Sequence, residues 1–125
     1  MGSKKHALSD QQRKLLPLTP AVFYVLFALA DGEKHGYAIM QQVTTLSDAQ
    51  FRMGPGTLYT TIQRLVDLQL IEEMFSSNEQ DTRRRYYRLT RMGETLLQAE
   101  LARMRSLLDK AHKWKLAPSG RSSAT

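Results

Sequence analysis

Apolar residues occupy almost every position of residues 21–30, and this run comes directly after Thr19-Pro20. A capping threonine followed by a proline at the first helical position is a typical helix start, so the pattern predicts a helix that Asp31-Gly32 ends. Because the helix is apolar on all sides, we expect it to be buried at the centre of the fold.

Two further helices are predicted. The first begins at His35-Gly36-Tyr37 and fades near residues 44–47; residues 51–53 then fit either a brief edge strand or an extended turn. The second covers residues 55–68, after the turn Gly54-Pro55-Gly56. Its apolar positions at helical spacing are Leu58, Ile62, Leu65 and Val66. Small or polar residues are expected on the outer face, namely Thr57, Thr60, Thr61 and Arg64.

The pattern then changes to that of a hairpin and a long helix. Residues 71–75 and 84–89 are predicted strands, joined by a polar turn at 76–82. A helix capped by Thr90 is expected to reach about Lys115, and its apolar residues recur at 4-3-4-3 spacing. They are Leu97, Leu101, Met104, Leu108 and Ala111. The predicted fold is mostly α with a small β-hairpin, a winged helix-turn-helix followed by a long C-terminal helix.

These elements divide the chain into four parts. We expect a disordered leader at 1–9, a winged helix-turn-helix domain at 10–89, a separate C-terminal helix at 90–115 and a flexible tail at 116–125.

Composition narrows the classes of function. A chain of 125 residues with 42% hydrophobic residues is long enough for one folded domain. It contains no cysteine, which excludes disulfides and thiolate zinc sites and fits a cytoplasmic location, and it contains no apolar run long enough to span a membrane. The formal net charge of +6 favours polyanionic partners.

The distribution of charge favours duplex DNA. Five arginines lie within residues 83–91, whereas residues 53–70 carry only Arg64 and Asp67. The short outer side chains of the 55–68 helix would let it enter a major groove, and the arginine-rich hairpin would lie on the neighbouring backbone. Taken singly, the helix could be an ordinary solvated helix and the arginines an ordinary salt-bridged surface. The adjacency of the two features points to DNA.

Other functions find little support in the sequence. Its histidines, His6, His35 and His112, are scattered, and Glu72 and Glu73 alternate along a strand, so neither a catalytic nor a metal site is expected. No cofactor is expected. A protein adaptor or an RNA-binding protein is the remaining alternative, but the hairpin keeps its charge and the outer helix face offers only Tyr59 for stacking on bases.

Four segments of this chain resemble the PadR-like transcriptional regulators, over residues 18–113 and in the same order. They are His35-Gly36-Tyr37-Ala38-Ile39, Gly56-Thr57-Leu58-Tyr59, Arg64-Leu65 with Leu70-Ile71, and Arg84-Arg85-Tyr86-Tyr87-Arg88-Leu89-Thr90 with Gly93. The resemblance implies a winged helix, a C-terminal dimerisation helix, and repression that a small molecule relieves. The chain is similar to the short subfamily with one C-terminal helix, although Thr60 stands where the family often has proline.

The resemblance and the outer-face pattern together give a set of expected DNA contacts. On the helices they are Tyr37, Gln41, Thr57, Tyr59, Thr60, Thr61, Gln63 and Arg64; on the hairpin they are Arg83, Arg84 and Arg85. Strand alternation places one of Tyr86 and Tyr87 against the core and the other outward.

The 4-3-4-3 stripe must be covered, either by the first long helix of the same chain or by a second copy. A second copy is better supported, and a two-fold dimer would read a palindromic site with half-sites roughly 34–36 Å apart. The resemblance also suggests an effector pocket between the last and the first helix, lined by Phe23, Phe27, Leu101, Met104, Leu108 and Trp114. Ordinary core and interface packing is the alternative for those residues.

Overall fold

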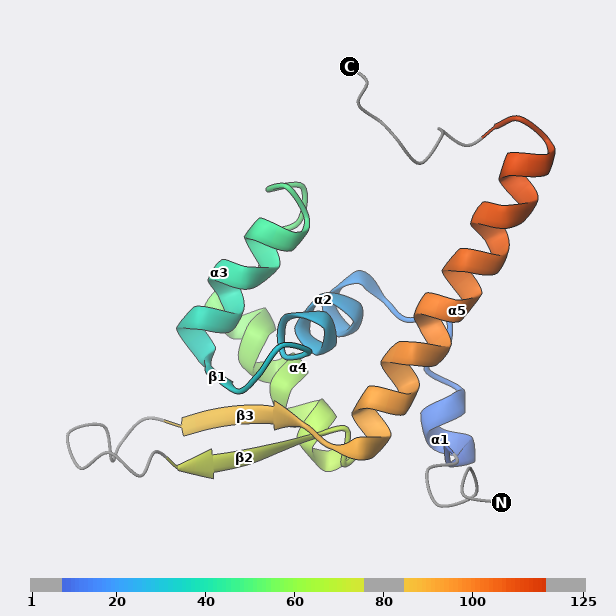
Figure 1. The fold of residues 1–125 in the computed structure, drawn as a ribbon. Helices are drawn as coiled ribbons and strands as arrows, with labels where there is room; N and C mark the ends of the chain where they lie inside the picture. Colours follow the sequence, from blue (N-terminus) through green and yellow to red (C-terminus); the bar gives the residue numbers. More distant parts are fainter. Residues whose placement is uncertain (1–7, 76–84, 117–125) are drawn as a thin grey trace.

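The computed structural model describes residues 8–75 and 85–116 of the chain, and helices make up most of it (Figure 1). The elements in chain order are α1 (Asp10–Arg13), α2 (Pro20–Ala28), β1 (Lys34–His35), α3 (Gly36–Leu46), α4 (Pro55–Asp67), β2 (Ile71–Phe75), β3 (Arg85–Leu89) and α5 (Arg91–Lys113). Residues 1–7 of the expected leader (1–9), the expected hairpin turn (76–82) with residues 83–84, and residues 117–125 of the expected tail (116–125) lie outside the described residues. Ser9 caps α1 in a capping box with Gln12.

Helix α2 is the centre of the core, as its apolar sequence predicts. It packs against α3, α4 and α5, and Val25 and Leu26 are fully buried. The side chain of Thr19 accepts a hydrogen bond from the N–H of Val22, and Pro20 occupies the first turn. The sequence therefore specified both the start of this helix and its place in the fold.

The sheet has three antiparallel strands in the order β1-β3-β2, one more than the sequence predicts. Strands β2 and β3 form the hairpin, with Ile71 opposite Leu89 and Phe75 opposite Arg85. The short strand β1 pairs with the other edge of β3, placing His35 opposite Tyr86. Residues 51–53 form no strand, so the extended-turn alternative is the correct one.

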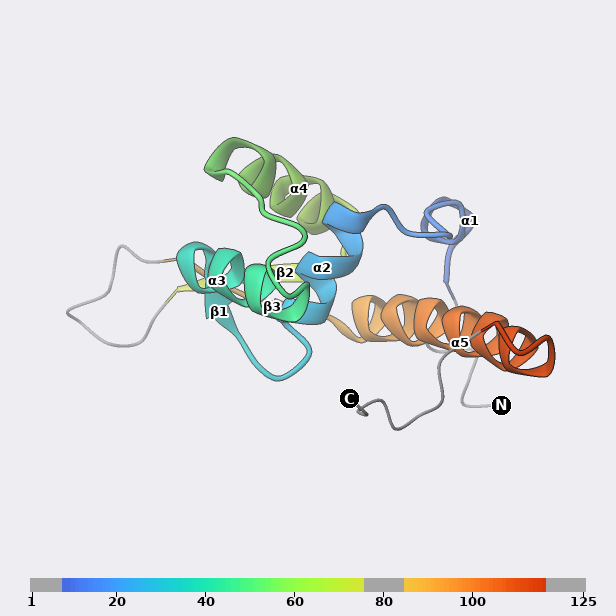
Figure 2. The ribbon, with the colours of Figure 1, turned by 90° about the horizontal axis from the view of Figure 1, so that it is seen from above.

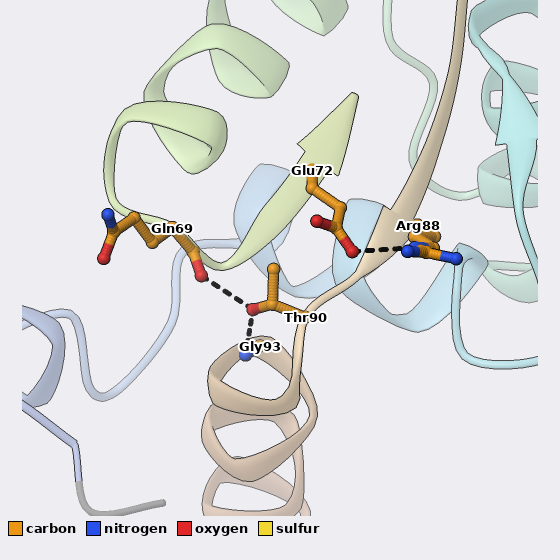
Figure 3. A network of polar contacts seen from close by, with 5 residues as sticks. All are labelled: Gln69, Glu72, Arg88, Thr90 and Gly93. Atoms are coloured by element: carbon orange, nitrogen blue, oxygen red, sulfur yellow. Dashed lines mark hydrogen bonds and ion pairs between the residues drawn. The ribbon is translucent and has the colours of Figure 1, made fainter. Parts of the chain in front are cut away.

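Two close contacts join the start of α5 to the segment between α4 and β2. A Cβ built on Gly93 would lie 1.9 Å from the carbonyl oxygen of Leu70, so the first turn of α5 packs directly on the chain that enters β2. The Thr90 hydroxyl donates to the carbonyl of Gln69 and accepts from the N–H of Gly93 (Figure 3). Thr90 therefore caps α5, as predicted, and also ties its start to the end of α4.

The hairpin and α5 leave the helical body on opposite sides (Figures 1 and 2). Only the first part of α5 is covered: Leu96 and Leu97 are buried in the core, whereas Leu107 and Leu108 are exposed. The fold is thus a winged helix, in which the hairpin of β2 and β3 is the wing. The long helix α5 extends away from this wing.

Candidate nucleic-acid interface

Helix α4 presents a polar face opposite the core. Leu58, Ile62 and Leu65 are buried, whereas Thr57, Thr60, Gln63 and Arg64 are exposed. Gly54 at the N-cap provides no side-chain hydrogen bond, so the first-turn N–H groups have no cap and can meet a phosphate.

The prediction that Thr61 lies on this outer face is wrong. Thr61 is only 9% exposed, because its position on the helix falls beside those of Leu58 and Leu65 at the edge of the buried face. Gln63 does lie outward, and its amide donates to the carboxylate of Asp67 at 3.0 Å.

Two tyrosines lie exposed on the neighbouring helices α3 and α4. Tyr37 in the first turn of α3 is 60% exposed, and Tyr59 in α4 is 48% exposed. Gln41, one turn after Tyr37, is exposed as well. The structure therefore leaves these three predicted contacts open to solvent on two helices that pack together.

Gly36 at the start of α3 leaves room for the phenol of Tyr59 from α4. Gly36 is buried, and a Cβ at this position would lie 2.1 Å from the hydroxyl oxygen of Tyr59. Any side chain there would displace the phenol. His35 precedes Gly36 and caps α3, since its Nδ1 accepts from the N–H of Ala38 at 3.4 Å. The sequence pattern marked His35-Gly36 as a helix start but gave no individual role to either residue.

The structure shows which of the two hairpin tyrosines faces the core. Tyr87 is buried in the core, and burial raises the pKa of its phenol, with a further rise from the Glu73 carboxylate. Tyr86 is half-buried, and its ring meets the His35 ring edge-on, with centroids 5.7 Å apart. Neither ring is freely exposed, so the outward tyrosine expected from strand alternation is itself partly covered by β1.

Two arginines of the described hairpin have carboxylate partners on β2. The Nε atom of Arg85 lies 3.0 Å from a Glu73 oxygen, and that of Arg88 lies 2.7 Å from a Glu72 oxygen (Figure 3 shows the second pair). Because both arginine side chains are more than half exposed, solvent weakens the pairs and a polyanion can compete for the guanidinium groups. The other two predicted wing contacts, Arg83 and Arg84, lie outside the described residues.

The apolar stripe of α5 divides into two parts. Leu97 is 4% exposed within the single chain, so its assignment to a dimer seam is wrong: it belongs to the chain's own core. Leu101 and Leu108 are exposed, while Met104 and Ala111 are half-buried. Leu107 and Trp114, which the stripe did not include, add to the exposed apolar surface.

An ion pair between a buried carboxylate and a partly exposed arginine fixes the covered part of α5. Glu100 is 1% exposed; its carboxylate accepts two hydrogen bonds from Arg103 and one from the N–H of Leu18. The bonds from Arg103 hold the pKa of Glu100 below its ordinary value, although burial acts in the other direction. The sequence analysis overlooked this residue, whose only signal was an arginine three positions later.

The structure has a groove that the proposed effector residues do not line. Phe23 and Phe27 are half-buried neighbours in an aromatic cluster, with ring centroids 5.3 Å apart. A groove of about 390 Å³ lies instead between α1 and the end of α4. Its lining residues are Gln11, Lys14, Leu15, Arg64, Asp67 and Leu68.

Within residues 8–75 and 85–116, no three histidine, aspartate or glutamate side chains gather as a metal ion would require. In the same residues, no helix combines the length and the apolar content needed to cross a bilayer.

Comparison with known families gives a match over more than half of the chain. The model of the transcriptional regulator PadR-like family matches residues 25–99. An uncharacterized protein of Lysinibacillus sphaericus is 27% identical over 88 residues, which cover 68% of this chain and 81% of that protein. An uncharacterized 37.1 kDa protein in transposon Tn4556 of Streptomyces fradiae is 40% identical over 87 residues, and the match covers 70% of this chain but 24% of that protein.

Solved structures share the fold at low sequence identity. A PadR family transcription regulator of Clostridium difficile has a TM-score of 0.64 at 23% identity, covering 77% of this chain and 98% of its own. Bacillus subtilis PadR, in complex with operator DNA, has a TM-score of 0.60 at 21% identity, covering 68% of this chain and 47% of its own. The RosR protein of H. salinarum has a TM-score of 0.62 at 23% identity, covering 81% and 90%. These matches confirm the predicted winged helix-turn-helix fold.

Proposed function

This chain belongs to the PadR-like family of transcriptional regulators, and we propose that it is a repressor that binds a specific duplex DNA sequence as a homodimer. Its family is one of regulators rather than enzymes. The observation that carries the proposal is the exposed polar face of α4 beside the exposed Tyr37 of α3. Bacillus subtilis PadR, which has a similar fold, has been captured in complex with operator DNA, and this supports DNA as the partner.

Each proposed contact has a distinct physical task. Thr57 and Thr60 are short enough to let the α4 backbone approach base edges, and their methyl groups can pack on thymine. Gln63 and Arg64 can donate to bases or phosphates, as can the side chains of Tyr37, Gln41 and Tyr59. We omit Thr61 from this set because it is buried.

The hairpin would supply the charge-dependent part of binding. Arg83, Arg84 and Arg85 precede or begin β3 and would lie on the neighbouring backbone or in the minor groove. Arg85 would exchange the Glu73 carboxylate for a phosphate. This exchange favours DNA because the ion pair is exposed and therefore contributes little in the free protein.

A homodimer would form through the exposed part of α5. Leu101, Met104, Leu108 and Ala111 continue in one line beyond the buried part of the helix. Pairing two copies along this line would bury apolar surface that the single chain exposes. Two α4 helices related by two-fold symmetry would require a palindromic operator with half-sites roughly 34–36 Å apart.

A small apolar or aromatic effector would release the repressor. The candidate lining remains Phe23, Phe27, Leu101, Met104, Leu108 and Trp114, since aromatic and methionine side chains adapt to flat ligands. As a regulator of transcription the protein would act in the cytoplasm.

Fluorescence anisotropy across a salt series tests the proposal. The duplexes are DNA from upstream of the protein's own gene and a random sequence. We expect the upstream duplex to bind more tightly, with a steep salt dependence. Thr60→Glu, which places a charge on the α4 face without entering the core, should abolish specific binding. An upstream duplex that binds no better than random DNA, or unchanged binding by Thr60→Glu, would refute specific recognition through α4.

The contribution of the wing to DNA binding is tested with one variant and one control. Replacing Arg83, Arg84 and Arg85 by alanine should reduce the slope of log affinity against log salt by about one for each lost phosphate contact. Arg105→Ala removes one exposed charge from α5, far along the chain from the wing, and should leave the slope unchanged. Equal slopes for the triple variant and the unmodified protein would remove the wing from the interface.

A further inference from the structure

Three elements meet where β1 passes into α3. His35 pairs with Tyr86 across the antiparallel ladder between β1 and β3, and Lys34 pairs with Tyr87. The next residue, Gly36, is covered by the phenol of Tyr59 from α4. Residues 34–37 therefore contact the wing on one side and α4 on the other, and they end at the exposed Tyr37.

His35 holds this junction through two separate contacts. Its Nδ1 accepts from the N–H of Ala38 and so fixes the first turn of α3, which carries Tyr37. Its ring lies edge-on to Tyr86, with an interplanar angle of 82°. One side chain thus sets the start of α3 relative to strand β3 of the wing.

Gly36 fixes the second tyrosine. A Cβ at position 36 would lie 2.1 Å from the Tyr59 hydroxyl oxygen and 2.7 Å from its Cζ atom. The obstructed atoms belong to a side chain that is 48% exposed, so the phenol can swing outward while the backbones of α3 and α4 stay in place. A side chain at position 36 would therefore move Tyr59 without removing core packing.

We infer that His35 and Gly36 are positioning residues that hold Tyr37, Tyr59 and wing strand β3 in the single arrangement that duplex DNA requires. The inference rests on the proposed function. Neither residue needs to touch the DNA: His35 acts through α3 and β3, and Gly36 acts through Tyr59. Because both contacts are already formed in the free protein, DNA binds without first ordering these groups.

A double-mutant cycle tests the role of Gly36, with affinity for the upstream duplex measured by anisotropy at one salt concentration. We expect Gly36→Ala to weaken binding about tenfold or more, the size of one lost contact. In the Tyr59→Ala background, the same substitution should have no further effect, because the side chain that it displaces is gone. Circular dichroism and thermal melting verify that each variant folds.

Two substitutions at His35 separate its contacts. His35→Asn keeps a capping oxygen but removes the ring, and His35→Phe keeps a ring against Tyr86 but removes the cap. We expect each variant to weaken binding, because His35→Asn loses the ring contact with Tyr86 and His35→Phe loses the cap of α3. If both bind like the unmodified protein, His35 does not position the interface.

The outcomes distinguish this inference from the function on which it rests. If the unmodified protein binds the upstream duplex and Thr60→Glu does not, yet Gly36→Ala binds normally, only the inference is overturned. The same holds if Gly36→Ala weakens binding equally with and without Tyr59. If the unmodified protein does not bind duplex DNA at all, the proposed function and the inference both fail.

Discussion

At the scale of single residues, the end of α4 shows how a short segment sets the direction of the chain. Gln69 has a φ of +63°; its N–H donates to the carbonyl of Val66, and the N–H of Leu70 donates to the carbonyl of Leu65. This pair of bonds is a Schellman motif, and the buried Leu65 and Leu70 supply its apolar contact. Glycine usually occupies the left-handed position, because side chains are strained there.

Gln69→Gly should therefore stabilise the fold. Relief of the left-handed strain outweighs the greater freedom of glycine in the unfolded chain, and we expect a gain of about 0.5–1 kcal/mol in the free energy of unfolding. Urea denaturation measures it. Gln98→Gly is the matched control, an exposed glutamine inside α5 where glycine should destabilise by a similar amount. Destabilisation by both would mean that Gln69 carries no strain.

Gly93 is fixed by backbone and not by a mobile side chain. A Cβ there would lie 1.9 Å from the Leu70 carbonyl oxygen, so Gly93→Ala should force α5 away from the hairpin and destabilise the fold by about 2 kcal/mol or more. Gly56→Ala, where a Cβ meets nothing within 4 Å, should be neutral or slightly stabilising. Thermal unfolding of the two variants side by side checks the contrast, which equal melting temperatures would contradict.

At the scale of elements, the sequence predicted the helices and strands whose starts are marked by local chemistry. Thr19, Pro55 and Thr90 each open a helix where expected, and β2 occupies residues 71–75 as predicted. Strand β1 was missed, because its two residues show no alternation and become a strand only by pairing with β3. Local signals specify elements that begin with their own caps but not an element defined by its partner.

The candidate interface was predicted less completely, and for a related reason. Thr61 was placed outward because it is polar, although its helical position borders the core. Leu97 was assigned to a second copy because the apolar stripe of α5 is continuous, and the sequence does not mark where the chain's own core ends. The roles of His35 and Gly36 depend on Tyr86 and Tyr59, which approach only after folding.

Glu100 joins two elements, and its effect should depend on pH. Its pKa is lower in the folded chain than in the unfolded chain, mainly through Arg103, so its contribution to stability is complete above the ordinary carboxyl pKa of 4.5. That contribution is lost as pH falls through the lower folded value. Glu100→Gln should therefore cost about 1–2 kcal/mol near neutral pH and progressively less on acidification.

Urea denaturation at a series of pH values from neutral to acid measures this effect. Glu94→Gln, at an exposed site in the first turn of the same helix, is the control and should change stability by about 0.5 kcal/mol or less at neutral pH. The free energies of unfolding of Glu100→Gln and of the unmodified protein should converge as the pH falls. A difference that stays constant down to the lowest pH would contradict the assigned role of the ion pair.

At the scale of the whole molecule, the positions of the wing and of α5 separate two tasks. The hairpin leaves the helical body on one side and α5 on the other (Figures 1 and 2), while Glu100 and Gly93 fix the start of α5 to the body. A partner bound along the exposed part of α5 would thus be held at a defined distance from α4. Dimerisation and DNA reading would use different surfaces of one rigid chain.

Leu108→Glu should consequently separate the dimer while leaving each chain folded. The side chain is 49% exposed in the single chain, so the charge enters solvent in the monomer but apolar surface in the proposed dimer. Ser106→Glu adds the same charge on another side of α5, where Lys110 already donates to the Ser106 hydroxyl, and should remain dimeric.

Sedimentation velocity and anisotropy on the upstream duplex should show loss of the dimer and of tight DNA binding together in Leu108→Glu. Loss of the dimer without loss of affinity would mean that a single winged helix suffices for recognition, and a dimer that survives Leu108→Glu would move the interface off this part of α5.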